Sequence, residues 1–178
     1  SEHFNPIVTR LQWIEKPIVA AVNGVAAGAG ANIALACDIT VAAESASFIQ
    51  AFSQIGLIPD SGGTFMLPRL VGLQKAKALM MLGEKVPAAD AVQLGMIYQC
   101  LPDEAFEAAA MAVATKLAAM PTKALGLTKT ALRWSYSHTF KEQLENEDKL
   151  QQRAAATTDF KEGVAAFLEK RKPNFTGS

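Results

Sequence analysis

Residues 17 to 37, "PIVAAVNGVAAGAGANIALAC", form an uncharged run that constrains the fold more than any other part of the sequence. The run is long enough to cross a bilayer. Proline, asparagine and glycine interrupt it, however, and most of its apolar residues are alanine. This pattern favours a buried strand, a turn and a buried helix over a membrane segment. The run also lacks the charged flank of a signal peptide, so we predict no membrane segment and no export signal.

Composition and charge narrow the class of protein. The 178 residues are 50% hydrophobic and 19% charged with a formal net charge of zero, which suits a compact soluble chain with a substantial core. Because there is no basic excess to neutralise phosphates, we predict no nucleic-acid partner. The two cysteines, Cys37 and Cys100, are not spaced as metal ligands. We therefore expect no metal site and a reducing, cytoplasmic location.

The first part of the chain, residues 1–102, is predicted to be an α/β core. Apolar, β-branched runs indicate buried strands, and glycine or proline marks the helix ends. Strands are expected at 17–22, 39–44 and 96–101, with a weaker candidate at 47–52, and helices at 28–37, after 64, at 73–82 and at 87–95. Because so few parallel strands make a poor core for so many helices, we expect further strands before Ser1 in the complete protein.

Residues 103–178 are predicted to be helical throughout. Helices are expected at 103–120, 122–134, 139–156 and 159–171. The third begins with a capping box, in which Thr139 is followed three residues later by Glu142. The fourth is expected to begin in the same way, with Asp159 and Glu162.

The segment "NGVAAGAGANIALACD" places a glycine-rich turn at the start of a helix. Backbone N–H groups at such a start can hold an oxygen anion, and Gly28 and Gly30 would let a ligand approach the backbone. A nucleotide site is poorly supported, because no third glycine stands at the required spacing and no P-loop lysine follows. Close packing of a helix on a strand through small residues remains the alternative.

Asp60 is the one carboxylate in "GLIPDSGGTFMLPRL". Aspartate often caps a helix, and a helix is expected to begin near Gly62. A catalytic base in an apolar pocket is the second interpretation. From the local sequence alone, both remain open.

The two segments together resemble the enoyl-CoA hydratase/isomerase (crotonase) superfamily. The similarity lies in "KPIVAAVNGVAAGAGANIALACDITVAAESASF", "GLIPDSGGTFMLPRLVG" and "DFKEGVAAFLEKRKPNFTG", and it extends over the whole chain. It implies a ClpP/crotonase-type α/β spiral of ββα units with a C-terminal helical region that forms trimers or hexamers. It also implies an acyl-CoA thioester substrate, with coenzyme A as part of the substrate and no separate cofactor.

The resemblance also implies roles for individual residues. Ala29 falls on one of the two backbone donors that stabilise an enolate-like anion, while the loop that supplies the other has no counterpart here. The two glutamates of the hydratases would fall on Asn32 and Phe52, so both general bases of that mechanism are absent. Asp60 falls where the isomerases keep their acid. One carboxylate that removes a proton and returns it elsewhere is enough to move a double bond, and Asp60 could cap its helix as well.

Within the superfamily, "AFSQIGLIPDSGGT" and "EGVAAFLEKRKPNFTG" resemble the ring-epoxide isomerases of phenylacetate degradation. Such enzymes convert a ring-1,2-epoxyphenylacetyl-CoA into an oxepin-CoA and move double bonds from the 3 to the 2 position. Apolar side chains near Asp60 would favour its acting as a base. They are Phe48, Phe52, Ile55 and Leu57.

Several other residues have implied binding roles. Phe48, Phe52 and Met66 are candidate pocket walls, with ordinary core packing as the alternative. Phe167 and Lys170 would line a coenzyme A site, often that of a neighbouring subunit. A hydratase-like enzyme, a non-catalytic acyl-CoA binder and a nucleotide-binding domain remain alternatives. The dehalogenase branch is disfavoured, because it keeps a tryptophan where this chain has Phe52.

Overall fold

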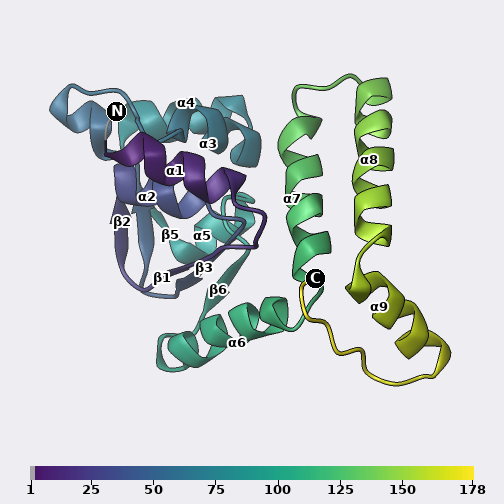
Figure 1. Cartoon of the computed structure of the whole chain (residues 1–178). Coiled ribbons are helices and arrows are strands. Elements are labelled where there is room, and N and C mark those ends of the chain that lie inside the picture. The colour runs from purple at the N-terminus through teal and green to yellow at the C-terminus, as the bar shows by residue number, and fades with distance from the viewer. Residues whose placement is uncertain (1–2) are drawn as a thin grey trace. The chain divides into compact units, whose positions relative to one another are not determined.

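The computed structural model describes residues 3–178, which form two compact units (Figure 1). The first unit comprises the chain up to Gln12 together with Ile18–Ala112. The second comprises Trp13–Pro17 and Val113–Ser178. No helix formed by residues 3–178 is both long enough and apolar enough to cross a membrane.

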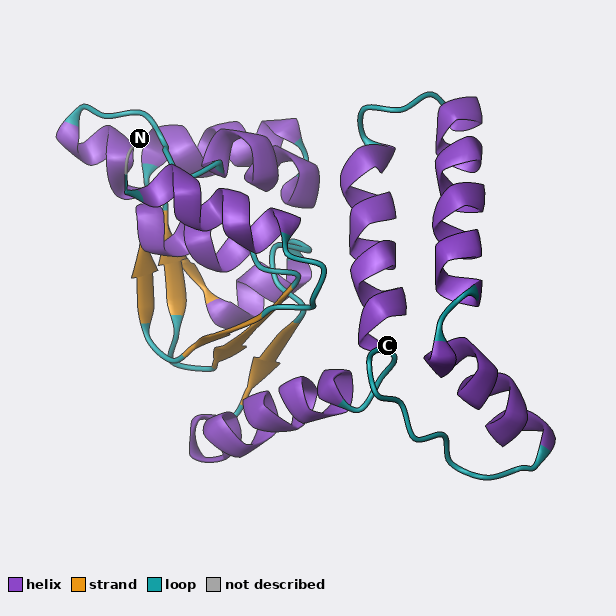
Figure 2. Cartoon of the chain, viewed as in Figure 1, coloured by secondary structure: helices purple, strands orange, loops and turns teal. Residues whose placement is uncertain are grey.

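Two small sheets organise the first unit, and Figure 2 shows their strands in orange. In one sheet the strands β1 (Val19–Val22), β3 (Ile39–Ala43) and β6 (Gln99–Leu101) are parallel and lie in the order β1-β3-β6. Their apolar sequences suit a parallel sheet that is covered on both faces. The second sheet has the order β2-β4-β5 and is formed by β2 (Val25–Ala27), β4 (Ser47–Ile49) and β5 (Lys85–Pro87). Here β2 pairs parallel to β4, whereas β5 runs antiparallel to β4.

Helices complete the first unit around one apolar core. The core contains small side chains of α2 together with Phe48, Leu67 and Leu79, all less than a tenth exposed. Gly83 ends one helix in the left-handed conformation, as a glycine at this position does readily. The helices are α1 (Phe4–Trp13), α2 (Ala29–Leu35), α3 (Gly63–Val71), α4 (Leu73–Leu82) and α5 (Ala88–Gln93), with 3₁₀ turns η1 (Ala51–Ile55) and η2 (Asp103–Ala105). The sixth helix, α6 (Phe106–Ala118), begins in the first unit and ends in the second.

The described part of the second unit is made of helices and loops (Figure 2). Helices α7 (Thr122–Ser135) and α8 (Phe140–Ala155) lie side by side as a hairpin, and α9 (Thr158–Leu168) follows (Figure 1). Glu15 belongs to this unit and pairs with Lys123 at 2.6 Å. The hydrogen bond from Lys123 lowers the pKa of the Glu15 carboxyl.

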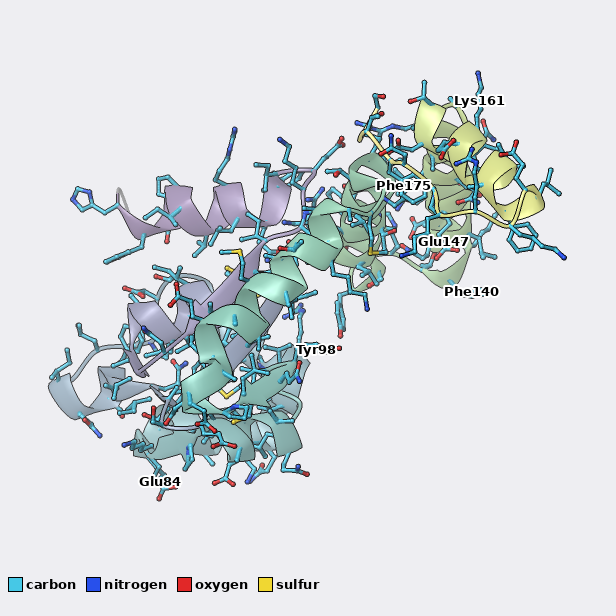
Figure 3. All side chains as sticks on the ribbon, turned by 90° about the horizontal axis from the view of Figure 1, so that it is seen from below. Glu84, Tyr98, Phe140, Glu147, Lys161 and Phe175 are labelled. Atoms are coloured by element: carbon cyan, nitrogen blue, oxygen red, sulfur yellow. The ribbon has the colours of Figure 1, made fainter. Side chains whose placement is uncertain are left out.

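The C-terminal tail, residues 170–178, folds back onto α9. The buried carboxylate of Asp159 accepts hydrogen bonds from the backbone N–H groups of Thr176 and Gly177 at 2.7 and 2.9 Å. Glu162 binds Arg171 through both carboxylate oxygens, at 2.6 and 2.9 Å. The ring of Phe175, labelled in Figure 3, lies against Gly163. We call this set of contacts the tail clasp.

Most of the predicted elements are confirmed, with shifted ends. The capping box at Thr139 and Glu142 is confirmed, because both of its hydrogen bonds are present. The predicted cap at Asp159 is wrong. Thr157 is the N-cap of α9 and accepts from the Phe160 N–H at 3.1 Å, because Asp159 already lies inside the helix and binds the tail. Helix α1 and the short strands β2 and β5 were not predicted from the sequence.

Candidate active site

The start of α2 is shaped by Gly28. Its φ of 53° and ψ of −121° place it in a backbone conformation that side-chain-bearing residues rarely adopt. Its N–H donates to Ile49 O at 2.8 Å, which fixes the turn to the end of β4. Ala29 follows as the first residue of α2, so its N–H has no acceptor within the helix. Ala29 is half-buried and the following Gly30 is exposed, so the N–H of Ala29 can serve as the predicted donor.

Asn32 lies one turn further along α2 and is completely buried. Its Nδ2 donates to the main-chain oxygen of Asp60 at 2.9 Å. Its Oδ1 accepts from Nε2 of Gln50, a second buried amide, at 2.8 Å. We call this pair of side chains the amide brace. It ties the loop between η1 and α3, which carries Asp60 and which we call the Asp60 segment, to the same helix that begins with Ala29.

Gly63, at the start of α3, lets α3 approach Asn32 of α2 closely. A Cβ atom at this position would lie 2.3 Å from Nδ2 of Asn32, closer than real contacts allow. Gly63 is itself buried at the start of α3, and its N–H donates to Asp60 O at 2.8 Å. The Asp60 main chain is therefore held from two sides, by α2 and by α3.

The Asp60 side chain is exposed, and its Oδ1 accepts a hydrogen bond from Ser61 Oγ at 2.8 Å. The prediction that Asp60 caps its helix is wrong. Gly62 is the N-cap of α3, and it makes no side-chain cap hydrogen bond. Ser61 and Gly62 both have positive φ, so the chain turns twice between Asp60 and the helix. The carboxylate is thereby left without the N-terminal N–H groups that a cap would bind.

The apolar side chains predicted near Asp60 differ in their burial. Phe48 is 1% exposed and belongs to the hydrophobic core. Phe52 is also buried, and its ring lies 3.5 Å from the position of a Cβ built on Gly28. Ile55 and Leu57 are 73% and 59% exposed, so the expected enclosure of Asp60 by these two side chains is wrong for this chain.

An apolar cavity of about 440 Å³ adjoins the Asp60 segment. Pro59 and Thr64, which lie on either side of Asp60 in the sequence, are part of its wall. The remaining wall comes mainly from η1, α3 and α4 and includes Leu57, Ile58, Met80 and Met81. Met66, a predicted pocket wall on α3, is half-buried and lies outside this lining.

Phe167 and Lys170 belong to the second unit. Phe167 near the end of α9 is 83% exposed, and Lys170 just beyond it is also exposed. Their role in holding coenzyme A stays a prediction. Within residues 3–178, no three His, Cys, Asp or Glu side chains gather in a group that could hold a metal ion.

The amide brace and the hydrogen bond from Ser61 to Asp60 were not predicted from the sequence. One signal for the brace was present. Asn32 interrupts an otherwise small and apolar helix, and a buried amide must find hydrogen-bond partners. Its partners are 18 and 28 residues away in the sequence, so their identity could not be predicted from local pattern.

Comparison with known proteins identifies the family of the chain. The family model described as "Enoyl-CoA hydratase/isomerase" matches residues 1–178. The chain is 48% identical over 174 residues to the 1,2-epoxyphenylacetyl-CoA isomerase of Escherichia coli K12, covering 98% of this chain and 66% of that protein. It is 46% identical over 176 residues to a protein of Rhodobacter capsulatus named "Probable enoyl-CoA hydratase", covering 99% of this chain and 68% of the relative. The chain thus spans about two thirds of the length of these relatives.

Solved structures show the same fold. A crystal structure of an enoyl-CoA hydratase from Polaromonas sp. JS666 superposes with a TM-score of 0.94 at 35% identity. The match covers 98% of this chain and 68% of that one. The α/β fold is therefore the crotonase fold, and the chain belongs to the enoyl-CoA hydratase/isomerase family.

Proposed function

We propose that the protein is an acyl-CoA isomerase in which Asp60 is the single acid/base and the Ala29 N–H binds the thioester oxygen. The observation that carries this proposal is the hydrogen bond from Asn32 Nδ2 to Asp60 O. Asn32 lies one helical turn after Gly28, since its N–H donates to Gly28 O at 3.1 Å. The carboxylate-bearing residue is thus tied to the helix that presents the backbone donor.

Double-bond migration needs little more than these two groups. Asp60 removes a proton from the carbon between the thioester and the double bond of a 3-enoyl-CoA. The electron pair delocalises onto the thioester oxygen, where the Ala29 N–H stabilises the developing charge. The protonated Asp60 then returns the proton to the far end of the original double bond, which gives the 2-enoyl-CoA. No atom is gained or lost.

The ring-1,2-epoxyphenylacetyl-CoA is the second substrate that we propose. Its conversion to an oxepin-CoA is also a rearrangement without gain or loss of atoms. The name of the Escherichia coli relative, 1,2-epoxyphenylacetyl-CoA isomerase, supports this substrate class. The apolar cavity beside Pro59 and Thr64 offers a place for a ring or an acyl chain near the base.

A hydratase-like activity is the second candidate, favoured by the name of the Rhodobacter capsulatus relative. Water addition in this family would use acids at positions 32 and 52, where this chain has Asn32 and Phe52. Asn32 is fully engaged in the amide brace, and Phe52 is buried beside Gly28. These contacts favour isomerisation over hydration. A non-catalytic acyl-CoA binder is the remaining alternative, and the tie between the Asp60 main chain and the helix that begins with Ala29 argues against it.

Assembly into a homotrimer or hexamer is part of the proposal. The α7–α8 hairpin has a groove of about 610 Å³ whose wall includes Leu127, Leu132 and Leu144. Leu132 and Leu144 are 64% and 49% exposed, and apolar surface of this kind favours a protein partner. Sedimentation analysis of the complete protein tests the assembly, and a monomer at micromolar concentration would contradict it.

The test of the activity compares wild type with Asp60→Asn in the complete protein that contains this sequence. The substrates are a 3-enoyl-CoA and the ring-epoxide CoA ester. We expect Asp60→Asn to lower kcat by about 100-fold or more, because an amide cannot relay a proton, while the melting temperature stays the same. Asp103→Asn is the matched control, since Asp103 also accepts a serine hydroxyl bond, from Ser45 at 2.9 Å. Retained activity in Asp60→Asn would show that the base lies elsewhere.

A further inference from the structure

Ser61 has an unusual backbone for a residue with a side chain. Its φ is 52°, in the left-handed region, and it is 1% exposed. Among residues 3–178, only Ser61 and Lys170 combine a positive φ with a side chain. Glycine adopts this conformation without steric cost, whereas other residues do so at a penalty. The serine side chain must therefore contribute something that glycine would not.

That contribution is a hydrogen bond to the carboxylate of Asp60. Ser61 Oγ donates to Asp60 Oδ1 at 2.8 Å, a normal length for a hydroxyl donor. With Oδ1 engaged in this way, Oδ2 is the oxygen left to exchange a proton with substrate. Bonds to an ionised acceptor are also stronger than neutral ones.

The rest of the Asp60 residue is already fixed. Its main-chain oxygen accepts from Asn32 Nδ2 at 2.9 Å and from the Gly63 N–H at 2.8 Å. The carboxylate is exposed, so its rotation about the side-chain bonds is the freedom that remains. Ser61 removes this freedom, because its own side chain is buried and cannot swing away.

We infer that Ser61 is a positioning residue, which holds the Asp60 carboxylate in the one rotamer that aims Oδ2 at the substrate. This inference rests on the proposed function of Asp60 as the acid/base. The strain in the Ser61 backbone is then part of the site, since it brings the hydroxyl beside the carboxylate. Loss of the hydroxyl slows the proton transfers but leaves thioester binding unchanged, because the hydroxyl donates to the Asp60 carboxylate and the thioester is bound by the Ala29 N–H.

The experiment compares Ser61→Ala and Ser61→Gly with wild type in the complete protein, with a 3-enoyl-CoA as substrate. Both variants remove the hydroxyl, but only glycine also relieves the backbone strain. We expect kcat to fall about tenfold in both, with KM unchanged, since misplacement of a catalytic group acts on the chemical step. We expect Ser61→Gly to melt at a higher temperature than Ser61→Ala. Ser45→Ala, which removes the comparable bond from Ser45 to Asp103, serves as the control with unchanged kcat.

High-resolution crystal structures of the two Ser61 variants supply a readout that needs no turnover. We expect the Asp60 carboxylate to occupy two or more rotamers in both variants and one rotamer in wild type. A single, unchanged rotamer in both variants overturns the inference, whatever the activity. Full kcat in Ser61→Gly overturns it as well, because a purely structural serine would be replaced by glycine without loss. If wild type isomerises neither substrate, the proposed function fails, and the rotamers still decide whether Ser61 positions Asp60.

Discussion

Two irregular segments of the molecule, the Asp60 segment and the C-terminal tail, are each fastened to helices, but by different chemistry. The Asp60 main chain is held by neutral amides, through Asn32 and the Gly63 N–H. The tail is held by carboxylates, through Asp159 and Glu162. The hydrogen bonds from Arg171 and from the Asn174 N–H lower the pKa of Glu162, so this fastening of the tail depends on pH. The amide hydrogen bonds to the Asp60 main chain carry no titratable group and do not depend on pH in this way.

The largest effect on stability is expected at Asn32. Asn32→Leu leaves the buried Nε2 of Gln50 without its acceptor and removes one of the two donors to Asp60 O, which costs about 2–4 kcal/mol of unfolding free energy. Urea unfolding measures the loss. Asn146→Leu is the control, since Nδ2 of Asn146 is buried without a hydrogen-bond partner among residues 3–178. Equal losses of unfolding free energy in the two variants would show that the hydrogen bonds of the amide brace do not stabilise the fold.

A smaller effect is expected at Asp159. Asp159→Ala removes the acceptor for the Thr176 and Gly177 N–H groups and costs about 1–3 kcal/mol. Because the tail is released, its amide hydrogens should exchange faster than those of α3. Hydrogen exchange followed by mass spectrometry separates the two regions. Equal acceleration in both would mean that the tail clasp and the Asp60 segment unfold together.

The smallest effect is expected at Glu162. The hydrogen bonds from Arg171 and from the Asn174 N–H lower the pKa of Glu162 from 4.5 to about 2. A carboxyl whose pKa is lower in the folded state adds stability above pH 4.5, and this contribution disappears as the pH falls from 4.5 toward 2. Glu162→Gln should therefore lower the melting temperature slightly at pH 7 and should converge with wild type near pH 2. A constant difference from pH 7 to pH 2 would contradict the assignment.

Elements whose signal lies in adjacent residues could be predicted from the sequence. The strand around Val19–Val22, the helix that ends before Gly83 and the capping box at Thr139 are of this kind. The misplaced cap at Asp159 has a tertiary cause. Thr157 and Asp159 are both residue types that often cap helices. Because the Asp159 carboxylate accepts a hydrogen bond from the tail, Thr157 is the residue that caps α9.

Only those parts of the candidate active site that have a signal in adjacent residues could be predicted from the sequence. The roles of Asp60 and Ala29 were predicted from the resemblance of whole segments and stay predictions, while the structure connects their two elements through Asn32. The positive φ of Ser61 could not be read from the sequence, because a side-chain-bearing residue adopts it rarely. The short strand β2 was missed because its three residues stand between two turns and show no periodicity of their own.

The contact between Gly63 and Asn32 has a consequence for how such a chain can evolve or be redesigned. Since a Cβ on residue 63 would lie 2.3 Å from Nδ2 of Asn32, the two positions form an epistatic pair. Alanine at position 63 becomes acceptable only when residue 32 is made smaller in the same step. A glutamate at position 32 would have no Nδ2 donor for the main-chain oxygen of Asp60, so this change would leave the Asp60 main chain with the Gly63 N–H as its remaining donor.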